Sequence, residues 1–379
     1  MKHKSTKNVN NNVIKKVYVL FFLLSIIFSQ DKIELKQADY LSSKAINQQT
    51  VTTLSGNIIF QKDGMLLYAD TGVQSSQNNI LKLYSNVKIE DKNKTIFCDS
   101  LTYNTDAEII EMFGNIAING SDQTITANNG KINNNDGKII LQNNAKIINL
   151  KQRIEGEIIE LFFENQKVKT LKVLQNGTIF SNNYGYEKID RNKAVENEDI
   201  LKGRFINIEI NNDSISEIQL IGMASSLIHL YEDSLYQGIN KISGDKINLK
   251  LKNNNATNLE SVGGVIGQFN PSISNISQQK VDYRGQRVEF DTNTQQSKIF
   301  GEANISQVGM DLTAAQINID WNSNILEAFD KNQHNKNEYL QPTLIENGRE
   351  PISGKSMIYN IEDRKGKVIA GSTKIQNNL

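Results

Sequence analysis

The stretch TIFCDSLTYN, from Thr95 to Asn104, places a cysteine, an aspartate and a serine side by side. Cys98 is the only cysteine of the chain, and a thiol beside a carboxylate and a hydroxyl has the residue types of a nucleophilic site. Such a site also needs a base within hydrogen-bonding distance of the thiol. The three histidines, His3, His229 and His334, share no motif with Cys98. The secondary-structure element that contains Cys98 must therefore show whether the residue is catalytic or structural.

That element belongs to a repeat. Four asparagines follow one another at intervals of 29 residues, in the segments SGNIIF, SNVKIE, GNIAIN and NNAKII; they are Asn57, Asn86, Asn115 and Asn144. Each is followed by an apolar residue, a variable residue and a second apolar residue. This alternation predicts a strand with one buried face in every copy.

A second strand follows about ten residues later in each copy, with the pattern apolar-x-small-x-x-apolar-x-apolar. The stretch around Cys98 is the second of these strands, and Cys98 stands where other copies have alanine or glycine, as at Ala127 and Gly156. The pattern recurs at less regular spacing as far as Tyr359. A small residue followed by a change of phase predicts a bulge where two backbones come close. We therefore interpret Cys98 as a tolerated small core residue and predict no catalytic site and no metal site.

The first 29 residues have the features of a signal peptide. Five lysines precede or flank an apolar run of 12 residues, Val17–Phe28, which is too short for the about 20 residues of a membrane-spanning helix. Removal of this segment takes the formal net charge from 0 to −5, because it contains no acidic residue. The exported chain is mildly acidic and has no basic run, so nucleic acid is not expected as a partner. One cysteine also excludes an internal disulfide.

After the signal, no segment shows a sustained helical period, and turn sequences such as Asp63-Gly64 and Asp136-Gly137 separate the strands. The sequence therefore predicts an all-β fold. A propeller, a parallel β-helix and an open stack of antiparallel strands folded in two are the alternatives. Three short strands in each 29-residue repeat favour the folded stack, with an apolar interior between its two halves.

Three segments resemble the organic-solvent-tolerance (OstA) family: LSGNIIFQKDGMLLYADTGV, CDSLTYNTDAEIIEMFGNIAI and YNIEDRKGKVIAGST. That family includes periplasmic lipopolysaccharide-transport proteins of the LptA, LptC and LptD types. The resemblance covers 37–151 well and 282–373 in part. It implies an OstA-type β-jellyroll, with antiparallel strands folded into an elongated V-shaped repeat array that holds acyl chains between its walls.

The resemblance implies a non-catalytic bridge without a cofactor, in the periplasm and in contact with the outer membrane. The implied partners are lipopolysaccharide or a related outer-membrane glycolipid, LptC-like and LptD-like proteins, and further copies of the chain joined end to end. The inward apolar residues of the first copies would line the lipid site: Ile58, Phe60, Leu67, Val87, Ile89, Ile96, Ile116, Ile118 and Ile125.

We expect a signal peptide at 1–29, a first OstA-like module at 30–175, an irregular β continuation at 176–280 and a second module at 281–379. The last segment also resembles the part that precedes the membrane barrel in LptD-like proteins, so the front part of such a protein is one alternative. A structural or polysaccharide-binding β-solenoid is another, which needs exposed aromatic rows. An enzyme built on repeats would need acidic residues in adjacent copies, but Asn128 interrupts the column of Asp70 and Asp99.

Overall fold

The computed structural model describes residues 33–46, 49–62, 64–75, 79–91, 94–165, 167–188, 190–253, 255–273, 279–335 and 337–373. Every regular element in these residues is a β-strand, which confirms the predicted all-β class. Within the same residues, no helix is present that has the length and apolarity to cross a membrane. The predicted signal peptide lies outside the described residues.

The chain forms two compact units. Among the described residues, the N-terminal unit contains 33–180 and Arg204–Ser216, and the C-terminal unit contains Ser181–Gly203 and 217–373. Three strands contribute residues to both units. They are β11 (Lys167–Tyr186), β12 (Ala194–Asn211) and β13 (Ser214–Glu232).

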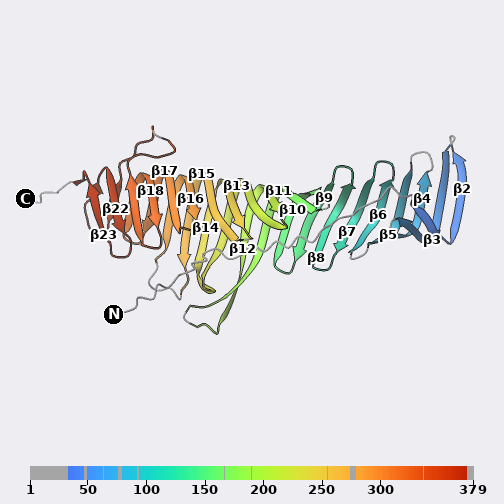
Figure 1. The fold of residues 1–379 in the computed structure, drawn as a ribbon, viewed down its shortest axis with the longest axis horizontal. Coiled ribbons are helices and arrows are strands. Elements are labelled where there is room, and N and C mark those ends of the chain that lie inside the picture. Colours follow the sequence, from blue (N-terminus) through green and yellow to red (C-terminus); the bar gives the residue numbers. More distant parts are fainter. Residues whose placement is uncertain are drawn as a thin grey trace, which may run out of the picture. The chain divides into compact units, whose positions relative to one another are not determined.

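The N-terminal unit is a ladder of antiparallel hairpins in which each strand from β3 to β10 pairs with the next in chain order (Figure 1). Both β1 and β2 pair with β3. The strands are β1 (Glu34–Gln37), β2 (Tyr40–Ile46), β3 (Gln49–Lys62), β4 (Met65–Ser75), β5 (Ile80–Asp91), β6 (Lys94–Asn104), β7 (Ile109–Asn119), β8 (Gln123–Asn133), β9 (Lys138–Asn149) and β10 (Gln152–Glu164).

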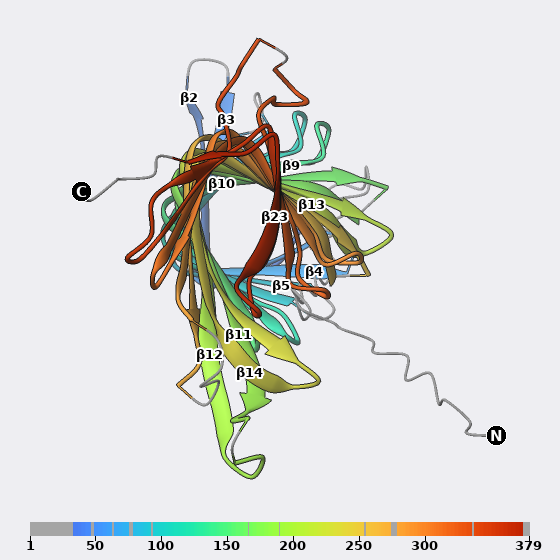
Figure 2. The same cartoon turned by 90° about the vertical axis from the view of Figure 1, so that its left-hand side faces the viewer.

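The C-terminal unit repeats this arrangement from β13 to β18, and its strands curve around a common interior (Figure 2). Two shorter strands, β19 and β20, then share the free edge of β18. The strands are β14 (Leu235–Lys252), β15 (Asn255–Pro271), β16 (Val281–Asp291), β17 (Gln296–Gln307), β18 (Met310–Asp320), β19 (Ile325–Phe329), β20 (Thr343–Glu346), β21 (Ile352–Ser353), β22 (Ser356–Asn360), β23 (Lys365–Ile369) and β24 (Ser372–Thr373).

Every odd-numbered strand from β3 to β17 contains two successive residues with positive φ near its middle. The repeat asparagines are the second members of the first four pairs, for example Gly114 and Asn115 with φ of 72° and 46°. The register between neighbouring strands shifts at these pairs, as between Phe113 and Ile116. Glycine and asparagine tolerate this left-handed conformation best, which explains why the repeat conserves its asparagine from copy to copy.

Odd- and even-numbered strands both bend at the level of these bulges, and the buried face of each strand changes phase there. In β6, Ile96 and Cys98 point inward before the bend, and Leu101 and Tyr103 point inward after it. The two halves of the strands thus form two walls with the core between them. Small residues beside the bend leave room for neighbouring side chains: a Cβ added to Gly130 would lie 3.0 Å from Cε of Met112, its partner on the adjacent strand. The antiparallel, bent-strand jellyroll class predicted from the sequence is confirmed.

Candidate functional site

Cys98 lies in the core of the N-terminal unit and is 5% exposed. Burial, together with the neighbouring Asp99 carboxylate, raises the pKa of the thiol from 9.0 to about 12. The Asp99 carboxylate accepts hydrogen bonds from Asn115 Nδ2 at 3.0 and 3.3 Å, across the bulge. Both described histidines belong to the C-terminal unit, where Asp199 binds the Nδ1 atom of His229 at 2.9 Å. Cys98 therefore has the surroundings of a packed core residue.

The nine residues predicted to line a lipid site all point into the N-terminal unit and are between 0% and 4% exposed. Six of them form one continuous row across six strands: Phe60 faces Leu67, Leu67 faces Ile89, Ile89 faces Ile96, Ile96 faces Ile118, and Ile118 faces Ile125. The row is packed closely. Contact with lipid at these residues stays a prediction.

A buried lysine joins the two margins of the N-terminal unit. Lys62, at the end of β3, is 4% exposed, and its Nζ donates a hydrogen bond to Tyr103 Oη at 2.6 Å. The Glu108 carboxylate, in the turn after β6, lies 3.8 Å from the same Nζ. We call these three residues the Lys62 clasp. A small space of about 10 Å³ lies at Ile89 and Lys94 in the same unit, and burial lowers the pKa of Lys94.

The C-terminal unit has room inside. A cavity of about 530 Å³ lies between its walls. Its sides are mainly apolar residues of β13 to β18, namely Ile228, Leu230, Ile242, Leu259, Phe269, Val281, Val288, Phe290, Ile299, Ile305 and Ile319. Tyr283 also points inward; it donates a hydrogen bond to Asn240 Oδ1 at 3.0 Å, and burial raises its pKa to about 12.

The rim of this cavity is polar. Carboxamides of Gln279, Gln307, Asn322 and Asn324 line it together with Glu362 and Arg364. Trp321 also borders it and donates a hydrogen bond from Nε1 to Ser297 Oγ at 2.7 Å. An apolar interior with a polar opening suits an amphiphile, whose chain avoids water while its head group remains hydrated.

Beyond the cavity, the walls meet again near the C-terminal edge. Tyr359, on β22, donates a hydrogen bond to Glu346 Oε1 on β20 at 2.9 Å. Burial, and then this bond to a carboxylate, raise the pKa of Tyr359 to about 12, because ionisation would place two negative charges together. Tyr359 has the same position in the repeat as Tyr103, so a tyrosine joins the walls in both units.

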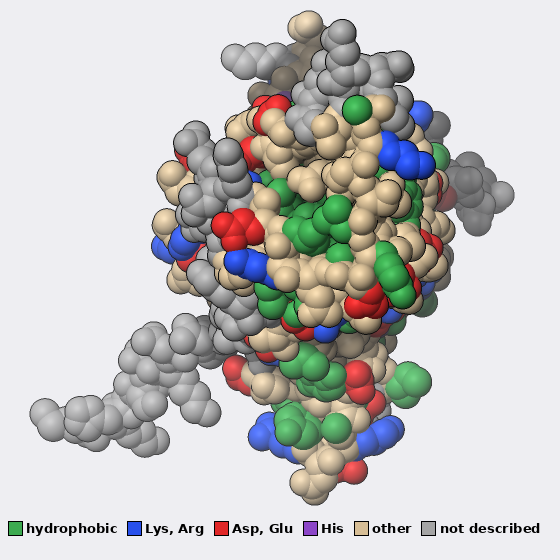
Figure 3. All heavy atoms as spheres, turned by 90° about the vertical axis from the view of Figure 1, so that its right-hand side faces the viewer, with side chains coloured by type: hydrophobic (Ala, Val, Ile, Leu, Met, Phe, Trp, Pro, Cys, Tyr) green, Lys and Arg blue, Asp and Glu red, His purple; other side chains and the backbone are tan. Residues whose placement is uncertain are grey.

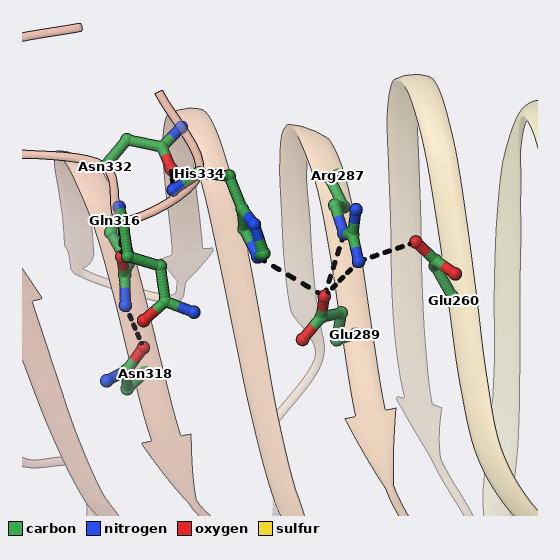
Figure 4. Close-up of polar contacts among 8 residues, drawn as sticks. Glu260, Arg287, Glu289, Gln316, Asn318, Asn332 and His334 are labelled. Carbon is green, nitrogen blue, oxygen red and sulfur yellow. Dashed lines mark hydrogen bonds and ion pairs between the residues drawn. The ribbon is translucent and has the colours of Figure 1, made fainter. Parts of the chain in front are cut away.

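A polar cluster covers part of the outer face of the C-terminal unit (Figure 4). Arg287 binds Glu260 at 2.8 Å and Glu289 at 2.6 Å, and His334 Nε2 lies 3.5 Å from Glu289. The His334 ring packs edge-on against Phe300 with a centroid distance of 4.5 Å. Each charged group here has a partner, so the cluster fastens the segment after β19 to the sheet. Within the described residues, no group of three or more His, Cys, Asp or Glu side chains is arranged to hold a metal ion.

The sequence predicts lining residues in the first copies of the repeat, and the cavity residues of β13 to β18 are not among them. Phe290 illustrates the available signal, because it occupies the repeat position that Tyr103 occupies in the N-terminal unit. Whether the walls touch depends on how side chains from distant strands fill the interior, and the alternation of apolar residues does not contain that information.

Comparison with known proteins gives a family match and similar solved structures. Residues 30–129 match the model of the family described as OstA-like protein. A search of curated proteins finds no match. A crystal structure of LptH from Pseudomonas aeruginosa, described as the LptA homologous periplasmic component of the lipopolysaccharide transport device, is similar at 15% identity, over 32% of this chain and 76% of that chain, with a TM-score of 0.25. The sequence similarity to the OstA-like family thus extends over residues 30–129 of this chain.

Proposed function

We propose that this protein is a non-catalytic, periplasmic lipid-binding bridge that shields the acyl chains of lipopolysaccharide, or of a related outer-membrane glycolipid, during transport. The match of residues 30–129 to the OstA-like family supports a role in this transport. The observation that carries the lipid-binding part is the cavity of about 530 Å³ between the apolar walls of the C-terminal unit. Each buried methylene contributes about 0.8 kcal/mol, so an apolar interior of this size binds an acyl chain favourably.

The predicted residues of the N-terminal unit belong to the same proposal. Their continuous apolar row would contact acyl chains once the walls of that unit part. We take the Lys62 clasp and the close packing as features of the N-terminal unit in its ligand-free state. We therefore propose that the C-terminal unit binds lipid first and that the N-terminal unit must open to do so.

Association with LptC-like and LptD-like proteins, or with further copies, would use the ends of the sheets. Strand β2 is an edge strand, and Tyr40 and Leu41 on it are 75% and 58% exposed. In the end view of the N-terminal unit, hydrophobic side chains gather in the middle of the face and polar ones surround them (Figure 3). An unpaired edge beside an apolar surface suits the addition of a strand from a partner.

Photocrosslinking in cells tests the proposal. Benzoylphenylalanine replaces Phe290, which lines the cavity, and in a matched variant replaces Phe97, an outward aromatic residue that is 41% exposed. We expect a lipopolysaccharide adduct at position 290 and none at position 97. A third variant at Ile118 tests the predicted lining of the N-terminal unit.

A polysaccharide-binding protein is the second candidate, because Tyr84, Phe97 and Phe113 are 41%, 41% and 44% exposed. Exposed aromatic rings of this kind can stack on sugars. Adducts with polysaccharide at position 97, without any lipid adduct at position 290, would favour this candidate and contradict the lipid bridge.

A further inference from the structure

Arg364 occupies an unusual place at the rim of the C-terminal cavity. It lies in the turn between β22 and β23, on one margin of the bent sheet. Its Nη2 atom reaches the opposite margin, where it donates to the Val308 carbonyl oxygen at 3.3 Å and to Gln279 Oε1 at 3.5 Å. Arg364 therefore spans the opening through which a ligand would enter.

The partners of Arg364 are neutral and distant. Among the described residues no carboxylate forms an ion pair with it, whereas the nearby Arg349 binds Glu346 at 2.6 Å. Hydrogen bonds from guanidinium to an anion are shorter and about twice as strong as those between neutral groups. An anion at the rim could thus replace two long contacts with charge-assisted ones.

The rest of the rim fits an anionic, hydrated group. Its carboxamides can donate to oxygen atoms without adding charge. Two carboxylates, Glu232 and Glu362, also line the cavity, and Asn324 Nδ2 donates a hydrogen bond to Glu362 at 3.0 Å. Because Glu362 is negative, it should weaken anion binding while Arg364 strengthens it.

We propose that Arg364 binds the anionic head group, a carboxylate or a phosphate, of an amphiphile whose acyl chain lies in the C-terminal cavity. This inference rests on the proposed lipid-binding function and adds the class of head group. A methylene is about as large as a water molecule, which takes ~30 Å³ in the liquid. The cavity of about 530 Å³ therefore has room for at least one long acyl chain.

The test measures binding of cis-parinaric acid, a fluorescent 18-carbon carboxylate, and of the corresponding alcohol to the full chain. We expect the acid to bind more tightly than the alcohol. Arg364→Gln should weaken binding of the acid about fivefold and leave the alcohol unchanged, as for a partly exposed ion pair. Glu362→Gln should strengthen binding of the acid. Arg349→Gln is the matched control, because that arginine is already paired, and it should alter neither probe.

Competition separates the two sources of negative charge. Hexadecyl phosphate and palmitate should both displace the parinaric acid at lower concentration than hexadecanol does, and Arg364→Gln should remove the advantage of whichever anion it recognises. Equal binding of acid and alcohol, or an equal loss of both in Arg364→Gln, would overturn the head-group proposal and leave lipid binding intact. Failure of the unaltered protein to bind either probe would contradict the proposed function itself.

Discussion

The single cysteine shows how the surroundings of a side chain decide its chemistry. Cys98 has an aspartate and a serine beside it in the sequence, yet its thiol is buried against Val87 on the neighbouring strand. Its pKa of about 12 keeps the thiol protonated, whereas a nucleophilic cysteine needs a lowered pKa. The residue types of a nucleophilic site are therefore present without its electrostatics.

We predict that Cys98 in the native protein does not react with Ellman's reagent at pH 8 and reacts fully after unfolding. In the unfolded chain the thiol ionises as the pH passes its ordinary value of 9.0, but in the folded chain it keeps its proton up to about 12. The free energy of unfolding should therefore fall as the pH rises through this range. Cys98→Ala should remove part of this fall, by up to about 1.4 kcal/mol per pH unit, and should cost about 1 kcal/mol at neutral pH. Rapid modification of the native thiol would contradict the assignment.

At the scale of elements, the bulge determines how each strand is bent. Asn115 combines two properties that the bend needs: it accepts a φ of 46°, and its amide donates to the Asp99 carboxylate on the preceding strand. The same pairing occurs between Asn86 and Asp70 at 2.6 Å. A bulge thus connects the left-handed backbone of one strand with a polar side chain of its neighbour.

The two contributions can be separated by substitution. Asn115→Ala should lower the free energy of unfolding by about 2–3 kcal/mol, because alanine in a left-handed conformation costs about 1–2 kcal/mol and the hydrogen bond contributes about 1 kcal/mol. Asn115→Gly keeps the backbone conformation and should lose only the hydrogen bond. Urea denaturation of the three proteins measures the difference. Equal losses in both variants would show that the positive φ is not a significant constraint.

These elements also show which parts of the fold could be predicted from the sequence. The alternation of apolar residues predicted strands and the inward row correctly, because both depend on local backbone conformation. Two details of the prediction were wrong. Each 29-residue repeat contains two long bent strands in place of three short ones, and the bulge beside Cys98 is formed by Ser85 and Asn86 on the neighbouring strand β5. The left-handed pairs of the C-terminal unit, such as Gly263 and Gly264, were not recognised, since longer strands there interrupt the regular spacing. The cavity was beyond prediction for another reason: it depends on contacts between walls that are distant in the sequence.

At the scale of the whole molecule, the two units have the same arrangement of bent antiparallel strands but differ in the free volume between their walls. The N-terminal interior is packed and its margins are joined by the Lys62 clasp, whereas the C-terminal interior encloses about 530 Å³. A buried ammonium group loses hydration on folding and must recover that free energy from its partners. The clasp therefore closes the N-terminal unit only while Tyr103 and Glu108 remain in place.

Because the buried lysine depends on its partners, we predict unequal effects for substitutions of Tyr103 and of Lys62. Tyr103→Phe removes an acceptor from a lysine that is 4% exposed and should lower the free energy of unfolding by about 2–3 kcal/mol. Lys62→Met replaces the charged group with an apolar one of similar length and should cost far less, because no buried charge then needs a partner. In the double variant the Tyr103→Phe substitution should become nearly harmless. Thermal unfolding of the four proteins, read as a double-mutant cycle, measures the coupling. Additive effects of the two substitutions would mean that the lysine and the tyrosine do not act together, and that side-chain packing alone closes the N-terminal unit.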